Sequence, residues 1–275
     1  MCSSDLGKTP TITKIFELNQ PGTLNSKSSG GGIMVKTHNE GKVEIQVFIR
    51  KNGKILSPSD PLVAEVLDDF DLEIEKNGSV INANAERKTN FNLLNNVGIY
   101  FTIIVPREMS CNVSSSGGGL KISGVEGTHN FKSSGGGVTL EEAHGSVYAH
   151  SSGGGVHLKN IHGDVDAGSS GGGVSVSGEC GYVKAKSSGG SVHVNISNLN
   201  KELYLQASGG GIDAIIQNGD ELGLDLDLSS SKVKIELQNF SGRSEKDRVK
   251  GTMNEGGIPV YMHASGGSVK VRYED

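Results

Sequence analysis

The stretch Ser151–Ser170, SSGGGVHLKNIHGDVDAGSS, decides the fold because close copies of it recur along the chain. In the middle of the chain a glycine-rich step begins at a constant interval, and each step leads into an apolar residue. The steps begin at Gly117, Gly135, Gly153, Gly171 and Gly189, and the apolar residues are Leu120, Val138, Val156, Val174 and Val192. A fixed period of this kind is the sequence signature of a repeat architecture.

Each repeat contains two short alternating segments. Val156 and Leu158 flank His157, and Val165 and Ala167 flank Asp166. Apolar residues at a period of two indicate strands with one buried face. Glycines lie at both corners between the strands, where we expect them to supply the positive φ of a sharp turn.

A single repeat cannot bury a core alone, but stacked copies can. Paired coils lie about 4.8 Å apart, so equivalent residues form inward rows. The expected rows are Ser133, Ser151, Ser169 and Ser187; Val147, Val165 and Val183; and Ala149, Ala167 and Ala185. Since parallel crossovers are strongly right-handed, the sequence predicts an all-β fold, a right-handed single-stranded parallel β-solenoid (β-helix) with about 18-residue coils. A β-sandwich or propeller needs hairpins and longer periods, which fit this pattern poorly.

The composition agrees with a thin core and excludes some classes of protein. Glycine makes up 41 of 275 residues, there is no Trp, and Phe and Tyr number only 7 and 6. The net charge is −5 without a basic block, which argues against nucleic-acid binding. No apolar stretch approaches the roughly 18 residues of a membrane-spanning helix. The three cysteines do not suggest a disulfide framework.

The ends of the chain are less regular than its middle. Residues 1–7, MCSSDLG, match the translation of a common sequencing adapter, so we expect them to be an artefact and the true N-terminus, with any export signal, to be lost. Residues 8–110 are expected to form lead-in strands and a cap. Residues 111–275 are expected to form the repeats, continuous with the cap as one structural unit.

Three local patterns refine this division. In the cap, Asp60 and Pro61 are suited to begin a helix over Leu62–Phe70. Asp71–Ala85 is typical of two strands joined by a turn at Asn77-Gly78, and Val97–Val105 of a buried strand. Phe240–Gly257 interrupts the repeats as a loop or projecting hairpin. The last coil, which ends in Val269-Lys-Val-Arg-Tyr-Glu-Asp275, is then expected to close the stack.

Four blocks together resemble a known family. They are Ser29–Val35, Lys42–Val47, Ile103–Pro106 and the repeats over Ser114–Val194. In these the chain resembles the bacterial "putative adhesin" family, a Gly/Ser-rich β-solenoid domain of unknown function. The resemblance implies the fold above and no catalytic residues. Relatives are mostly exported or envelope-associated, which implies a periplasmic, outer-membrane-anchored or secreted protein.

One constellation points to metal chemistry. Glu126, His144, His162 and Cys180 each precede a glycine and follow one another at the interval of the repeat. A shared repeat position would bring neighbours within about 5 Å, and His and Cys are zinc or copper ligands. We therefore name His144, His162 and Cys180 as a candidate metal site. The alternative is a solvent-facing corner that accepts any polar residue.

An enzyme is the less favoured function. Asp164 and Asp166 could form the carboxylate pair of a glycosidase, but nearby Trp is lacking and no phosphate loop or nucleophile motif is present. We expect no catalytic residue and no cofactor.

The functional hypothesis is a non-catalytic extracytoplasmic binding or adhesion module of the cell envelope. Its flat polar faces would bind an unknown protein or glycan at the cell surface. Two alternatives are a self-assembling, bactofilin-like scaffold and the sensor domain of an envelope-stress anti-sigma system. The oligomeric state is left open.

Overall fold

The computed structural model describes residues 9–88 and 96–274, so the expectation for residues 1–7 lies outside the described residues. The chain divides into two compact units, Met1–Thr139 and Leu140–Asp275. The expected organisation into a lead-in over 8–110 and repeats over 111–275, as one structural unit, stays a prediction.

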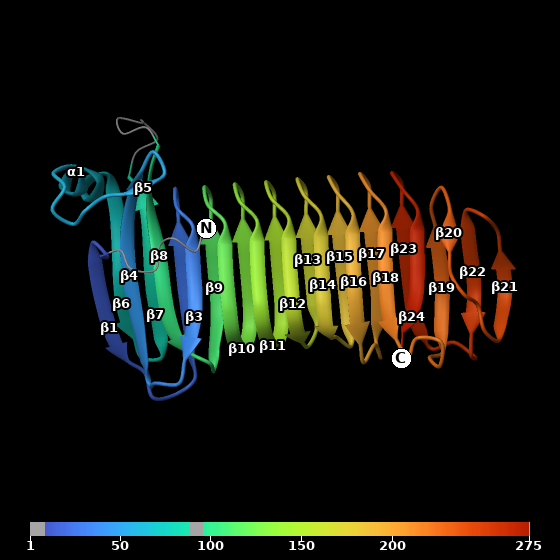
Figure 1. Cartoon of the computed structure of the whole chain (residues 1–275). Helices are drawn as coiled ribbons and strands as arrows, with labels where there is room; N and C mark the ends of the chain where they lie inside the picture. The colour runs from blue at the N-terminus through green and yellow to red at the C-terminus, as the bar shows by residue number, and fades with distance from the viewer. Residues whose placement is uncertain (1–8, 89–95, 275) are drawn as a thin grey trace. The chain divides into compact units, whose positions relative to one another are not determined.

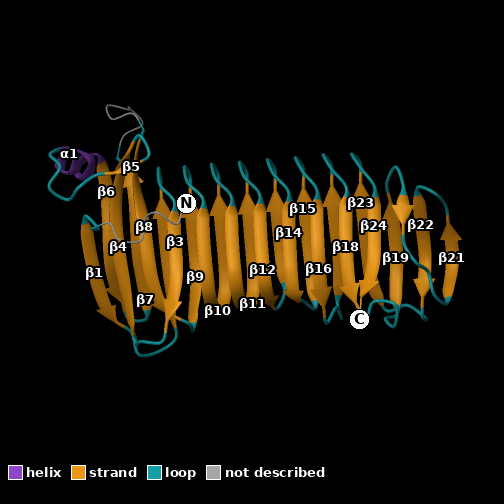
Figure 2. Ribbon diagram, in the orientation of Figure 1, coloured by secondary structure: helices purple, strands orange, loops and turns teal. Residues whose placement is uncertain are grey.

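Strands make up more than half of the first unit, and α1 is the one helix among the described residues (Figure 2). Its elements are β1 (Ile12–Glu17), β2 (Gly22–Ser28), β3 (Ile33–His38), β4 (Lys42–Lys51), β5 (Lys54–Ile55), α1 (Leu62–Asp69), β6 (Phe70–Asn77), β7 (Val80–Arg87), β8 (Val97–Pro106), β9 (Met109–Ser115) and β10 (Leu120–Ser133).

The local predictions for this unit are confirmed, except that Phe70, expected at the end of the helix, is the first residue of β6. The Oδ1 atom of Asp60 accepts a hydrogen bond from the backbone N–H of Leu62 at 2.9 Å, so Asp60 caps α1. Strands β6 and β7 form an antiparallel hairpin whose turn contains Gly78 at φ +61°. The buried strand β8 ends at Pro106 as expected.

Beyond this hairpin, strands of the first unit pair in parallel. Strand β2 pairs in parallel with both β7 and β9, and β3 pairs in parallel with both β8 and β10. The coil nearest the N-terminus therefore lies between two coils that come later in the sequence. Strand β1 joins through β4, to which it is antiparallel.

The second unit is built from short strands that lie side by side (Figure 1). They are β11 (Val138–Ser151), which begins at the boundary, β12 (Val156–His162), β13 (Val165–Ser169), β14 (Val174–Glu179), β15 (Tyr182–Ser187), β16 (Val192–Ser197), β17 (Glu202–Ala207), β18 (Ile212–Gln217), β19 (Leu224–Ser229), β20 (Val233–Lys234), β21 (Phe240–Ser244), β22 (Arg248–Met253), β23 (Ile258–Ala264) and β24 (Val269–Glu274).

The pairing in this unit confirms an all-β, mostly parallel, solenoid-like fold. Val147 pairs with Val165, and Val165 pairs with Val183, through β11, β13 and β15. On the other side Val174 pairs with Val156 and Val192 through β12, β14 and β16. All of these valines are buried, as the sequence predicted.

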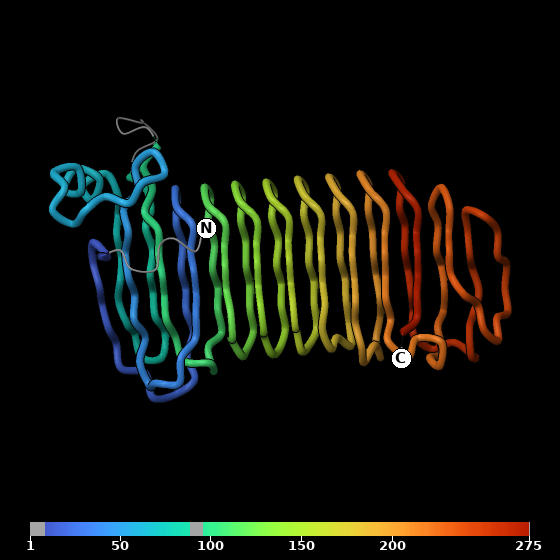
Figure 3. Tube along the Cα trace, in the orientation of Figure 1, coloured from blue at the N-terminus to red at the C-terminus, as the bar shows by residue number. Residues whose placement is uncertain are grey.

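The last coil is not where the sequence placed it. Strand β23 pairs in parallel with both β17 and β19, and β24 pairs in parallel with both β18 and β20. The trace in Figure 3 shows the C-terminal coil between two coils that precede it in sequence. The expectation that it closes the stack is wrong, because the antiparallel hairpin of β21 and β22 pairs on the far side of β19.

Buried serines and glycines make the corners of the repeat. The Ser169 hydroxyl donates to the carbonyl of Gly154 in the preceding coil at 2.7 Å and accepts the N–H of Gly172 at 2.9 Å. Ser187 makes the equivalent pair of contacts with Gly172 and Gly190. Each serine thus joins its own turn to the turn before it.

The expected role of the glycines is right at one corner and wrong at the other. Gly163 has φ +146°, in the region that favours glycine. Gly171 and Gly172, in the serine-glycine corner, do not have positive φ. A Cβ on Gly172 would lie 2.6 Å from the backbone N of Gly155, so this corner needs glycine because successive turns approach closely.

Candidate functional site

The outward side of β11, β13, β15, β17 and β23 carries two rows of polar and aromatic side chains. Because alternate residues of a strand point to opposite faces, the residues between the buried ones face solvent. The first row is Tyr148, Asp166, Lys184, Tyr204 and Tyr261; the second is His150, Lys186, Gln206 and His263, with the buried Gly168 at the β13 position between His150 and Lys186. We call this surface the tyrosine face.

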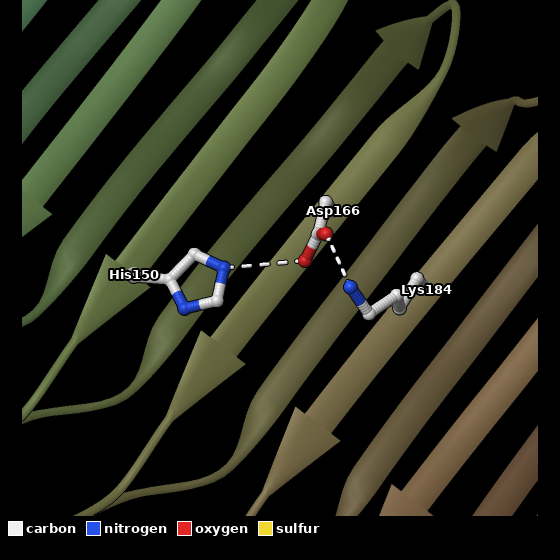
Figure 4. Close-up of polar contacts among 3 residues, drawn as sticks. All are labelled: His150, Asp166 and Lys184. Atoms are coloured by element: carbon white, nitrogen blue, oxygen red, sulfur yellow. Dashed lines mark hydrogen bonds and ion pairs between the residues drawn. The ribbon is translucent and has the colours of Figure 1, made fainter.

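Ion pairs order one end of the tyrosine face (Figure 4). One carboxylate oxygen of Asp166 lies 3.2 Å from Nε2 of His150, and the other accepts a hydrogen bond from Nζ of Lys184 at 2.7 Å. This hydrogen bond raises the pKa of Lys184. A Cβ on Gly168 would lie 2.5 Å from the His150 ring, so glycine at this position gives the imidazole its place beside Asp166.

Aromatic rings order the rest of the face. The rings of Tyr148 and His150 stack with centroids 4.1 Å apart, and those of Tyr204 and Tyr261 stack at 4.7 Å. The ammonium of Lys186 lies 4.8 Å from the centre of the Tyr204 ring. Tyr148 is 39% exposed, so its ring is open to solvent. The face therefore presents flat rings held in place by their neighbours.

A second feature is an open groove that crosses β11, β12, β14, β16 and β18. It has a volume of about 710 Å³ and is lined in part by His144, His162, Glu179, Asn195, Ser197 and Gln217. We call it the histidine groove. The rings of His144 and His162 stack with centroids 4.4 Å apart, and Nε2 of His162 lies 3.7 Å from a carboxylate oxygen of Glu179.

Cys180 lies away from this groove, inside the protein. It is fully buried, and its thiol donates to the carbonyl of Ile161 at 3.7 Å. Burial raises the pKa of the Cys180 thiol to about 12. Buried Cys111, in the first unit, has its pKa raised to about 12 for the same reason.

Most of the chain matches one known family of proteins. The family model, Toastrack DUF4097, matches residues 21–272. The chain belongs to the Toastrack DUF4097 family. This confirms the family resemblance read from the sequence.

Three solved structures of similar proteins come from bacteria. A "putative cell adhesion protein" from Clostridium sporogenes is 14% identical, with a TM-score of 0.29 and coverage of 96% of this chain and 99% of that one. A "putative adhesin" from Bacteroides fragilis is 12% identical, with a TM-score of 0.41 and coverage of 94% and 96%. Another from Parabacteroides merdae is 10% identical, with a TM-score of 0.36 and coverage of 96% of each chain. A search of the curated proteins finds no match.

The structure of this Toastrack protein separates the residues proposed as metal ligands. His144 and His162 come together as the repeat spacing predicted. The expectation that Cys180 shares their row is wrong, because the register shifts between Leu158 and Ile161 and pairs His162 with Glu179. A one-residue shift moves the next side chain to the opposite face. Glu126, in the first unit, pairs instead with Arg107 at 3.2 Å.

Within residues 9–88 and 96–274, no group of three or more His, Cys, Asp or Glu side chains is arranged to hold a metal ion. Metal binding by His144, His162 and Cys180 stays a prediction.

The two aspartates considered as a glycosidase pair have separate partners. Asp164 accepts a hydrogen bond from Lys201 at 2.7 Å, whereas Asp166 contacts His150 and Lys184.

None of the helices in the described residues is long and apolar enough to cross a membrane.

Sequence reasoning missed most of the histidine groove. Asn195, Ser197 and Gln217 lie in later strands and share no motif with the histidines. One signal was available. Glu142, Asn160 and Gly178 occupy the same position in successive repeats, and each has positive φ, at +58°, +55° and +140°. They mark an irregularity in each coil beside the groove.

Proposed function

We propose that this Toastrack protein is a non-catalytic binding or adhesion module that acts in the cell envelope or at the cell surface. The observation that carries the proposal is the tyrosine face. Its rings and charges are held by one another on a rigid sheet, so little side-chain freedom is lost when a partner docks. Tyrosine gives such surfaces large contact area at low entropic cost.

The proposal extends to the form of the coil and to location. We infer a right-handed coil in which one full turn leads from Val147 to Val165 and the next leads to Val183. The pairing of these residues through β11, β13 and β15 supports a coil of this length.

The location outside the cytoplasm rests on the family resemblance and would be tested by fractionating cells that express the native gene.

The edge of the second unit argues against the scaffold alternative. End-to-end assembly needs an open strand edge that accepts the next copy. Here the strand at the edge, β21, is short. Exposed Arg243 lies in it and exposed Glu245 directly follows it, and the two side chains are paired with each other. Charged side chains on a short edge strand are a common protection against such pairing.

The binding proposal is tested by comparing the face with a control surface. Labelled protein is added to intact bacterial cells and to an array of cell-surface glycans, and the double variant Tyr204→Ala, Tyr261→Ala is compared with wild type. We expect at least about a tenfold loss of affinity, since aromatic residues dominate the binding energy of such surfaces. His193→Ala, an exposed change on β16, serves as the control and should bind like wild type. Equal binding by wild type and the double variant would overturn the proposal.

A further inference from the structure

The histidine groove has a lining suited to one class of ligand. Imidazoles, carboxylates, amides and hydroxyls make up almost all of it, and they include both donors and acceptors of hydrogen bonds. Among the described residues that line it, there is no Lys or Arg and no large apolar side chain. This lining favours a ligand rich in hydroxyl groups over one that binds by apolar contacts.

The charges of the groove narrow the class of ligand further. Glu142 and Glu179 are the acidic residues of its lining, which contains no Lys or Arg among the described residues. An anionic ligand such as a phosphate or an acidic sugar would meet like charge without a cation to pair with. Glu179 also accepts a hydrogen bond from Asn198 at 3.2 Å, which fixes the carboxylate in its position. A neutral ligand fits these groups best.

The strand register gives the groove its length. His162 pairs with Glu179, Glu179 pairs with Ser197, and Gln217 follows on the next strand, so these side chains form a row across the strands. At about 4.8 Å per strand, the five positions from His144 to Gln217 span about 19 Å. Such a row suits an extended chain of several sugar units rather than a single one.

The backbone shapes the floor beside this row. Glu142 and Asn160 hold left-handed conformations, at φ +58° and +55°, which are unfavourable for a residue such as glutamate. The same repeat position is then Gly178, where a Cβ would lie 2.1 Å from the carbonyl oxygen of Ile161. Glycine is therefore required at this position, because the backbone of the neighbouring strand lies where a side chain would begin.

From these observations we propose that the histidine groove binds a segment of neutral oligosaccharide that lies across the strands. The inference goes beyond the tyrosine face and requires only that the chain be a binding module. Glu179 and Gln217 hydrogen-bond the sugar hydroxyls, and the paired imidazoles form one end of the site.

The test uses oligosaccharides of matched length. The full chain is titrated calorimetrically with cellopentaose, chitopentaose and maltopentaose, and with pentagalacturonate as the acidic counterpart. We expect at least one neutral pentasaccharide to bind and pentagalacturonate to bind at least about tenfold more weakly. Glu179→Ala and Gln217→Ala should each lower the affinity for the neutral ligand by about tenfold, as expected for a lost hydrogen bond to a charged or polar group.

Two controls separate this proposal from the proposed function. Ser175→Ala changes β14 outside the groove lining and should leave affinity unchanged, and thermal melts check that all variants fold. If Tyr204→Ala weakens pentasaccharide binding while Glu179→Ala and Gln217→Ala do not, the groove proposal is overturned and the tyrosine face stands. Binding of pentagalacturonate alone, or of none of the four sugars, also overturns the groove proposal.

Discussion

Replacing Ser169 by alanine tests the explanation of the serine-glycine corner. The hydroxyl is almost fully buried, donates to the Gly154 carbonyl at 2.7 Å, and accepts the Gly172 N–H at 2.9 Å. Alanine removes both bonds and leaves a backbone donor and acceptor without this partner. Each buried polar group left unsatisfied costs about 1–3 kcal/mol, so for two such groups we expect the free energy of unfolding to fall by about 2–6 kcal/mol.

Urea denaturation followed by far-ultraviolet circular dichroism measures this change. The neighbouring Ser170 is exposed, so Ser170→Ala is the matched control and should change the free energy of unfolding by less than about 0.5 kcal/mol. The slope of the transition should be the same in both variants, since neither alters the surface exposed on unfolding. If Ser169→Ala costs no more than Ser170→Ala, the serine hydroxyls do not hold the coils together and the reasoning fails.

Three further predictions follow from the packing. Gly172→Ala places a Cβ 2.6 Å from the backbone N of Gly155; we expect a loss of about 1–3 kcal/mol in thermal or urea unfolding, and a neutral effect would contradict the close-approach explanation. Burial raises the pKa of Cys111 and Cys180 to about 12, so about one thiol in ten thousand is ionised at pH 8. In the variant Cys2→Ser, which leaves only these two thiols, a colorimetric thiol reagent should react only after denaturant is added. Rapid reaction of the native protein would refute their burial. Met262 is fully buried on β23, between β17 and β19, so Met262→Ala should cost about 2–5 kcal/mol; a cost below about 1 kcal/mol, as for a frayed terminal coil, would show that β23 is not inserted there.

Local patterns predicted the strands well because each depends on nearby residues. The alternation of Val165 and Ala167 with outward Asp166 fixes which face is buried, and the structure confirms it. The cap at Asp60 and the turn at Gly78 likewise depend on a few adjacent residues. Turn geometry was harder to predict, because the same residue, glycine, serves positive φ at Gly163 and close backbone approach at Gly172.

The candidate site was only partly predictable, because sequence spacing is not the same as register. His144 and His162 share a repeat position and do stack. Cys180 continues the same spacing, but the irregularity after Leu158 removes one residue from the pairing and turns its thiol into the core. Whether a coil contains such a shift depends on how two strands pair, which the composition of one strand does not reveal.

The sequence by itself determined the all-β class, the buried and exposed faces of the repeats and the family, since a constant period with alternating apolar positions admits few other structures. Only the tertiary structure decided which coils are neighbours. Leu203 pairs with Val260, far along the chain, rather than with the next coil in sequence. Strands β19 and β23 both alternate buried and exposed residues, so either could pair with β17 by pattern alone. The choice is made by the packing of the whole unit and by the hairpin of β21 and β22, which occupies the other side of β19.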